Sequence, residues 1–217
     1  MQIKRFQFNP VEENTYVLYD ESGEAVIIDC GAFYKEEKEI LQTFIKDNKL
    51  TINHLLCTHL HLDHVFGNQF IFDTYQIRPE YDQDEELKSP SLPEQGRLFG
   101  MSMKDRWVPA GRYLKEGDNI QFGNSNLNVI SIPGHSPASL CFYSETDACV
   151  FTGDVLFRGS IGRTDLWGGN EELLLRGIRE KLLILPENTA IYPGHGMVTT
   201  VQYEKNSNPY LGNWKSF

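Results

Sequence analysis

Residues 58–64 read THLHLDH and place three histidines and one aspartate in one short segment. His59 and His61 are two residues apart, and in an extended loop such residues point to the same side, so both can bind one ion. Asp63 and His64 follow a turn and can face elsewhere. Zinc binds imidazole nitrogen and carboxylate oxygen, and a catalytic zinc site leaves one position open for water. The segment therefore predicts a metal centre.

The remaining histidines support this interpretation, because only one of the six in the chain lies outside such a setting, His54. His135 in IPGH and His195 in YPGH each follow a Pro-Gly pair that comes directly after an apolar strand. Two adjacent cations need a shared anionic ligand to offset their repulsion. Asp154 in FTGD follows another apolar strand. Alone it could equally be a helix cap or a turn residue, but beside five histidines we interpret it as a ligand.

Hydrophobic periodicity predicts strands and helices that alternate in two blocks. In the first block we expect strands over 3–8, 15–19, 25–28 and 52–57, and helices over 35–48 and 65–74. In the second block we expect strands over 119–122, 127–131, 140–144, 148–151 and 190–192, and a helix over 171–185 capped by Asn170. THLHLDH directly follows strand 52–57, and ligand sites commonly lie beyond the carboxyl ends of strands. The pattern predicts one layered α/β (α+β) domain over residues 1–217.

Residues 76–116 interrupt this pattern with a polar, proline-bearing stretch of poor periodicity. We expect a long excursion with one short helix. Long irregular segments inside compact domains are often lids or binding loops. A surface insertion without a role is an equal alternative.

Composition and charge narrow the class of protein. Apolar residues make up 40% of the 217 and charged residues 23%, which is ordinary for a globular chain. The net charge of −10 argues against a nucleic-acid or anionic-membrane partner. We expect no secretory signal and no membrane span, and hence a cytoplasmic enzyme. The four cysteines lack CxxC spacing, so we expect free, buried thiols at Cys30, Cys57, Cys141 and Cys149.

These motifs resemble those of the metallo-β-lactamase superfamily. HLHLDH resembles its HxHxDH signature, and the later PGHS, TGD and PGHG segments resemble its remaining metal-binding motifs in order. VIIDCG at 26–31 resembles the first family motif, whose aspartate, Asp29 here, buttresses the site. The resemblance runs from about residue 10 to residue 200. It implies a four-layer αβ/βα sandwich, in which two sheets pack together with helices outside.

The resemblance also implies a set of seven ligands for two divalent ions, zinc foremost, with iron or manganese as alternatives. The first ion would be bound by His59, His61 and His135. The second would be bound by Asp63, His64 and His195, and Asp154 would bridge the two.

Within the superfamily the chain resembles the short glyoxalase II-like (hydroxyacylglutathione hydrolase-like) enzymes, through FTGDVLFRGSIGRTDLWGGN at 151–170 and EKNSNPYL at 204–211. This resemblance implies a thioesterase that uses a hydroxide between two metal ions, with Asp63 orienting that nucleophile as the catalytic residue. A small-molecule thioester suits such a site, because a thiol of pKa about 8.5 leaves as a thiolate without an acid. Gly196-Met197 depart from the classical enzymes, which place a substrate-contacting tyrosine after this histidine.

Two further residues have roles that the sequence leaves open. Asp29 either fixes a ligand or a nearby loop, or is a turn residue at the end of a strand. Arg163 either contacts an anionic substrate or pairs with Asp165 and holds its own loop, and we favour the pair.

The main alternative activity is that of a persulfide dioxygenase of the same superfamily, which uses a single iron bound by two histidines and an aspartate. A β-lactamase and a nuclease fit less well, because most zinc β-lactamases place no bridging aspartate here and the chain is acidic. A non-catalytic binding module would be marked by lost ligands, and all seven are present.

Overall fold

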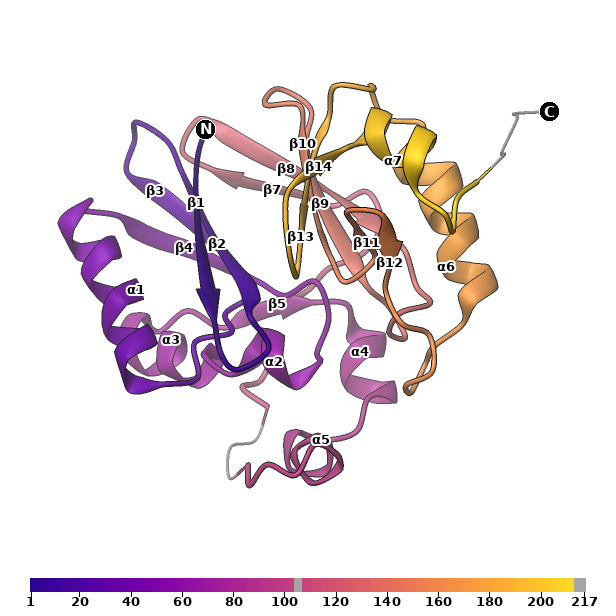
Figure 1. Cartoon of the computed structure of the whole chain (residues 1–217). Coiled ribbons are helices and arrows are strands. Elements are labelled where there is room, and N and C mark those ends of the chain that lie inside the picture. Colours follow the sequence, from indigo (N-terminus) through magenta and orange to yellow (C-terminus); the bar gives the residue numbers. More distant parts are fainter. Residues whose placement is uncertain (104–106, 213–217) are drawn as a thin grey trace.

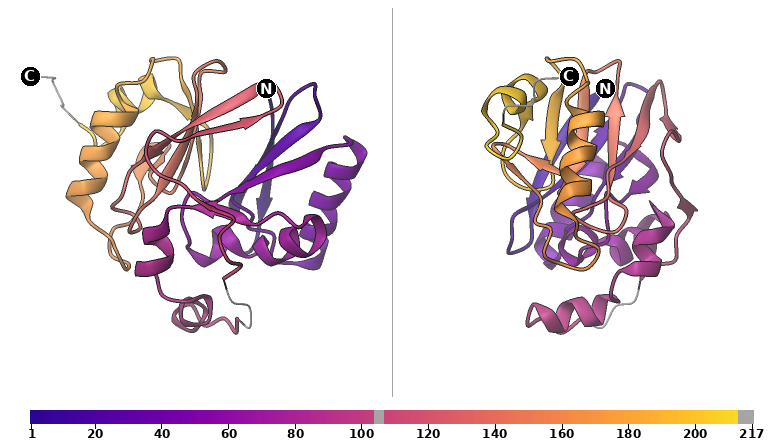
Figure 2. Two further views of the ribbon diagram at one scale, coloured as in Figure 1. Left: turned by 180° about the vertical axis from the view of Figure 1, so that it is seen from behind. Right: turned by 90° about the vertical axis from the view of Figure 1, so that its right-hand side faces the viewer.

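The computed structural model describes residues 1–103 and 107–212. Two six-stranded sheets face each other, and helices cover their outer faces (Figures 1 and 2). This is the four-layer sandwich that the family resemblance implies. The first sheet has the order β1-β2-β3-β4-β5-β6, and the second has the order β14-β13-β10-β9-β8-β7.

The first sheet is antiparallel from β1 to β3 and parallel from β3 to β6. Its strands are β1 Gln2–Phe8, β2 Glu13–Tyr19, β3 Glu24–Ile28, β4 Thr51–Leu56, β5 Pro79–Tyr81 and β6 Arg112–Tyr113. Its helices are α1 Lys35–Asp47, α2 Leu62–Val65, α3 Asn68–Tyr75, α4 Gln83–Lys88 and α5 Leu92–Leu98.

The second sheet is antiparallel except where β10 pairs with β13. Its strands are β7 Asn119–Phe122, β8 Ser125–Ser131, β9 Leu140–Ser144, β10 Cys149–Gly153, β13 Ala190–Pro193 and β14 Thr199–Thr200. A small hairpin of β11 Leu156–Phe157 and β12 Ser160–Ile161 follows β10. The outer helices are α6 Glu171–Gly177, which continues as a π-helical stretch Ile178–Leu182, and α7 Val201–Ser207.

Strand β3 shows why the layers form. Successive side chains of a strand point to opposite faces, so an apolar run buried on both faces must separate two cores. Val26 and Ile28 pack between the two sheets, where they share a cluster with Phe142 and Phe151 of the second sheet. Ile27 points the other way, into the cluster under α1 and α3. The sheet is thus fixed between its partner sheet and its helices, and its strand ends become rigid.

Most of the expected elements are present, with three corrections. In its described residues, segment 76–116 contains two helices and two short strands where one short helix was expected. Its α5 begins with a capping box of Ser91 and Glu94, a signal that the sequence carries. The expected helix 65–74 begins later, as α3 at Asn68, and a separate short helix, α2, precedes it. Gly67 lies between the two helices, where a Cβ atom would meet Cys30. The expected helix 171–185 changes to π geometry after Gly177.

Two composition-based expectations have structural outcomes. All four cysteines are free and buried, as predicted. In the described part of the chain, no helix has both the length and the hydropathy needed to cross a bilayer.

His54 links the two sheets through both of its ring nitrogens. Nδ1 lies 2.6 Å from a carboxylate oxygen of Glu80 on β5, and Nε2 lies 3.2 Å from the carbonyl oxygen of Gln121 on β7. Both oxygens can only accept, so the protonated ring satisfies both contacts. The hydrogen bond to Glu80 raises the pKa of His54 above its ordinary value.

A raised histidine pKa contributes stability that is fully present below the unfolded pKa of about 6.5 and is lost as pH rises through the folded value. We therefore expect His54→Gln to lower the free energy of unfolding by about 1 kcal/mol more at pH 6 than at pH 9. Urea denaturation of the metal-free wild type and variant measures this difference. An equal loss at both pH values would contradict it.

Candidate metal centre

The predicted ligands converge at the edge where the carboxyl ends of several strands meet. His59 and His61 follow β4, and Asp63 and His64 lie in α2. The other three ligands follow strands of the second sheet: His135 follows β8, Asp154 follows β10, and His195 follows β13. Residues from both sheets thus meet in one place, as the position of THLHLDH predicts.

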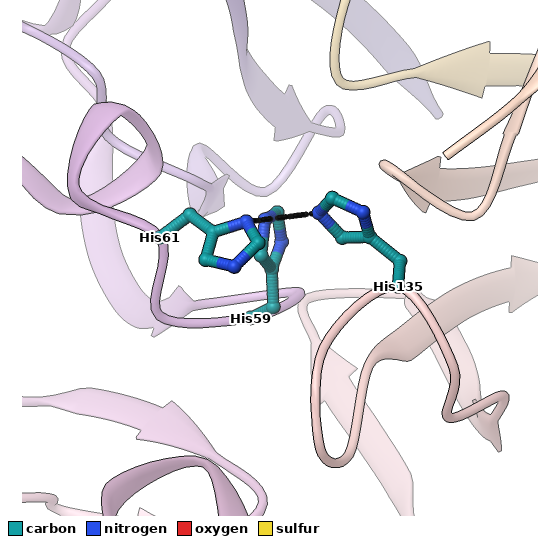
Figure 3. A group of neighbouring side chains, drawn as sticks. All are labelled: His59, His61 and His135. Carbon is teal, nitrogen blue, oxygen red and sulfur yellow. Dashed lines mark hydrogen bonds between the residues drawn. The ribbon is translucent and has the colours of Figure 1, made fainter. Parts of the chain in front are cut away.

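Three buried histidine nitrogens form the first group, drawn in Figure 3. His61 Nδ1 lies 3.0 Å from His59 Nε2 and 2.9 Å from His135 Nε2. The third side of this triangle, between His59 Nε2 and His135 Nε2, is 3.2 Å. Such a trio of converging nitrogens is the arrangement that one metal ion requires.

Asp63, His64 and His195 form the second group. Asp63 Oδ2 lies 3.1 Å from His195 Nε2 and 3.6 Å from His64 Nε2. Asp154 lies between the groups: its Oδ1 is 3.3 Å from His64 Nε2, and its Oδ2 is 3.7 Å from His135 Nε2. Its position is that of a carboxylate shared by both groups.

The outer hydrogen bonds decide which nitrogens of the first group carry lone pairs. Thr58 Oγ1 donates its hydrogen to Asp29 at 2.7 Å, so it accepts from Nδ1 of His59 at 2.9 Å. His135 Nδ1 donates to the carbonyl oxygen of Arg163 at 2.9 Å. A neutral imidazole carries one N–H, so Nε2 of both histidines presents a lone pair. Two lone pairs 3.2 Å apart repel each other unless a cation lies between them.

The second group has the same organisation. His64 Nδ1 donates to Asp29 Oδ2 at 2.9 Å, and His195 Nδ1 donates to the carbonyl oxygen of Val11 at 3.1 Å. Burial alone would lower the pKa of His64 and His195, but the carboxylates of Asp63 and Asp154, which face Nε2 of both rings, raise both pKa values above the ordinary one. Histidines that bind metals in proteins are commonly oriented in this way, by an oxygen that accepts from the other ring nitrogen.

Buried atoms without partners complete the test of whether a metal fits. Two ligand atoms make no hydrogen bond, namely His64 Nε2 and Asp154 Oδ1. Native structures seldom leave buried polar atoms unpaired unless an ion or water satisfies them. A set of imidazole nitrogens and carboxylate oxygens suits zinc, iron or manganese. The residues present therefore fit a pair of divalent cations.

Burial also keeps the first group in the form that binds metal. It lowers the pKa of His59 well below its ordinary value, and it lowers the pKa of His61 to about 3. Burial lowers the pKa of His135 as well. Neutral imidazoles expose lone pairs at pH 7, so no proton must be displaced from these rings.

Asp29 joins the ends of the THLHLDH segment. Its Oδ1 accepts from the backbone N–H of Thr58 at 2.7 Å, and its Oδ2 accepts from Thr58 Oγ1 and His64 Nδ1. It adopts a left-handed backbone conformation, with φ of 49°, which aims the carboxylate back at this segment. These contacts are those of a residue that fixes ligands.

Arg163 and Asp165 form the pair that the sequence favours. Nε and Nη2 of the guanidinium each donate to a carboxylate oxygen at 2.7 Å. Both side chains are more than half exposed, so the pair contributes at most about 1 kcal/mol. Arg163 also lines the cavity described next, so a role toward substrate stays open to test.

A cavity of about 790 Å³ opens over both groups. Its walls are mainly apolar, and they include Phe66, Phe99, Met101, Phe157 and Leu166. Phe99 and Met101 belong to segment 76–116, so this excursion forms a wall of the cavity. Trp167 packs edge-on against His61, with ring centroids 5.0 Å apart. Sequence analysis did not identify these wall residues, because isolated aromatic side chains in an aperiodic stretch carry no recognisable pattern.

A model of the metallo-beta-lactamase superfamily matches residues 9–195 of the chain, which include all seven predicted ligands. This chain belongs to the metallo-β-lactamase superfamily. It is 36% identical over 216 residues to the probable metallo-hydrolase YqgX of Bacillus subtilis, covering 99% of each chain. It is 36% identical over 215 residues to the hydroxyacylglutathione hydrolase GloC of Haemophilus influenzae, covering 98% of this chain and 99% of GloC. These matches place it among the metal-dependent hydrolases.

Three solved structures share the fold. The structure of the BLEG-1 B3 metallo-beta-lactamase has a TM-score of 0.86 at 37% identity, covering 98% of this chain and 100% of that chain. The structure of TTHA1623 in a di-iron-bound form has a TM-score of 0.82 at 33% identity, covering 96% of this chain and 100% of that chain. The structure of ETHE1 from Myxococcus xanthus has a TM-score of 0.78 at 26% identity, covering 98% of this chain and 85% of that chain.

We expect Asp29→Asn to lower the free energy of unfolding of the metal-free chain by about 1–3 kcal/mol. Both oxygens of Asp29 accept from donors, so the amide nitrogen of asparagine must face an N–H or O–H in either orientation. Asparagine tolerates the left-handed backbone, so the backbone itself is not strained. Urea denaturation measures the loss. The matched control is Asp47→Asn on the exposed end of α1, which should lower the free energy of unfolding by less than about 0.5 kcal/mol. Equal losses in the two variants would contradict the role of Asp29.

Proposed function

We propose that this chain is a thioester hydrolase of the glyoxalase II type with a centre for two divalent ions, zinc foremost. The observation that carries the proposal is that two histidines in each ligand group donate from Nδ1 to a fixed oxygen and turn Nε2 into the group. One ion would need only one such group. Ions bound there would supply a hydroxide near neutral pH and polarise an acyl carbonyl.

Asp63 is the residue we assign to proton transfer. Its carboxylate lines the cavity, and its side chain remains 21% exposed, more than those of the buried histidines around it. Oδ2 faces His195 Nε2 at 3.1 Å, so the ring fixes the orientation of the carboxylate. An aspartate so placed can orient a nucleophilic water and accept its proton. Asp154 would offset the charge of both ions from between the groups.

The cavity suits a thioester better than an amide. Apolar walls remove water from a bound acyl group, and a thiol of pKa about 8.5 leaves as a thiolate. An amide nitrogen would have to be protonated as it leaves. The likeness to GloC, whose name denotes a hydroxyacylglutathione hydrolase, supports the same reaction class. Small-molecule thioesters are the substrates we propose.

Two other activities have support from named structures. The likeness to ETHE1 supports the alternative of a persulfide dioxygenase with a single iron. The likeness to BLEG-1 supports a β-lactamase, which the sequence analysis placed lower. The prepared second group favours the two-ion thioesterase over the dioxygenase, and oxygen uptake separates these two reactions.

We expect zinc-loaded protein to hydrolyse S-lactoylglutathione with kcat/KM above about 10⁴ M⁻¹s⁻¹, followed as loss of the thioester absorbance. The same preparation is tested on a chromogenic cephalosporin, and iron-loaded protein is tested for oxygen uptake with glutathione persulfide. Negligible turnover of this thioester and of other acyl thioesters, together with turnover of either rival substrate, would overturn the proposal.

We expect His59→Ala and Asp154→Ala to lose bound zinc and thioesterase activity together, because each variant removes a ligand from a buried site. Elemental analysis and the thioester assay measure the two losses on the same preparations. The matched control is His54→Ala, which alters a histidine outside both groups and should retain both properties. A ligand variant with full activity would show that the groups are not the reaction centre.

A further inference from the structure

The peptide between the ligands His59 and His61 is held from segment 76–116. The backbone N–H of Leu60 donates to Glu85 Oε2 at 3.0 Å, and its carbonyl oxygen accepts from Gln95 Nε2 at 2.9 Å. Glu85 in α4 and Gln95 in α5 are both fully buried. Two side chains from the excursion thus satisfy both polar groups of this residue.

The same carboxylate also holds the loop that carries the third histidine. Glu85 Oε1 accepts from Ser136 Oγ at 2.5 Å and from the backbone N–H of Ala138 at 2.7 Å. Ser136 directly follows the ligand His135. One side chain therefore joins the two loops that present all three histidines of the first group.

A carboxylate suits this position better than any neutral side chain. Burial raises the pKa of Glu85, while the hydrogen bonds from Ser136, Leu60 and Ala138 act in the opposite direction. An amide of the same shape would place its NH₂ group against the N–H of Leu60 or the N–H of Ala138. A buried charge is costly unless donors satisfy it, and here three donors from the two loops do so.

The second group is held by different side chains. Asn9 Nδ2 donates to the carbonyl oxygen of Asp63 at 3.0 Å. Asn14 Nδ2 donates to the carbonyl oxygens of Pro193 and Gly196 at 2.9 and 3.0 Å, on either side of His195. These asparagines lie around β2, far along the chain from segment 76–116. Asp29 contacts both groups, whereas Glu85 and Gln95 contact only the loops of the first group and these asparagines contact only the second.

We propose that Glu85, assisted by Gln95, is a positioning residue for the first group, and that it sets the metal affinity of His59, His61 and His135 without setting that of the second group. The inference rests on the proposed two-ion centre. It gives segment 76–116 a role besides that of a cavity wall: the helices of the excursion hold the metal-binding loops. Partners that orient ligands typically contribute a factor of about 10–100 in metal affinity.

The test measures zinc affinity by competition with a chromophoric chelator, in two backgrounds that each leave one group complete. In His195→Ala only the first group is complete, and there Glu85→Gln should weaken zinc binding by about 10–100-fold. In His135→Ala only the second group is complete, and there Glu85→Gln should change zinc affinity by less than about threefold. The matched control is Glu86→Gln, the neighbouring residue on α4, which should change neither affinity.

If Glu85 had a purely structural role, Glu85→Gln would lower the zinc affinity of both groups alike, and that result would overturn the proposal. Unchanged zinc affinity in both backgrounds would also overturn it. Where Glu85→Gln does not fold, Ser136→Ala replaces it, because this variant removes one donor and keeps the carboxylate. Ser136→Ala should lower the zinc affinity of the first group by about tenfold, the lower end of the range, and leave the zinc affinity of the second group unchanged. Wild-type protein that binds no zinc would contradict the metal centre itself, and the role of Glu85 with it.

Discussion

The mutual approach of neutral imidazole nitrogens at the edge of the two sheets is the constraint on which the rest of the site depends. Nitrogens of His59, His61 and His135 lie 2.9–3.2 Å apart. The outer nitrogens of two of these rings already donate to oxygens that accept. Within the triangle only Nδ1 of His61 can donate, and one N–H shared between two lone pairs satisfies both of them weakly. Burial disfavours an added proton, so a cation is the partner that suits these three nitrogens best.

Such a site requires a rigid frame, and the fold supplies one. Strand β10 is buried along its whole length and β4 is buried at its carboxyl end, and the loops that follow these strands are held by side chains from distant parts of the chain. Asp29 fixes the THLHLDH segment from β3, while Glu85 and Gln95 reach the same segment from the opposite side. Asp29 and the helices α4 and α5 thus both make hydrogen bonds to this one loop. Ligand geometry in this chain is a property of its tertiary hydrogen bonds.

The candidate ligands and the layered α/β fold could be predicted from the sequence because both leave local signals, and the family resemblance added the grouping of the ligands. THLHLDH, the two Pro-Gly-His segments and the apolar strands are each short and contiguous, and their spacing reflects side-chain direction directly. The hydrophobic pattern does not reveal the helices of segment 76–116, because they are short and polar. Their stability comes from caps such as the Ser91–Glu94 box and from buried contacts such as those of Glu85. Contacts between residues 25 and 51 positions apart have no periodicity that a single sequence displays.

The central claim is that two ions occupy the two groups and share Asp154. Anomalous diffraction at the zinc edge from crystals of zinc-loaded protein tests it most directly. The account predicts two peaks, one among His59, His61 and His135 and one among Asp63, His64 and His195, with Asp154 between them. A single peak at full zinc loading, or peaks away from these residues, would contradict it.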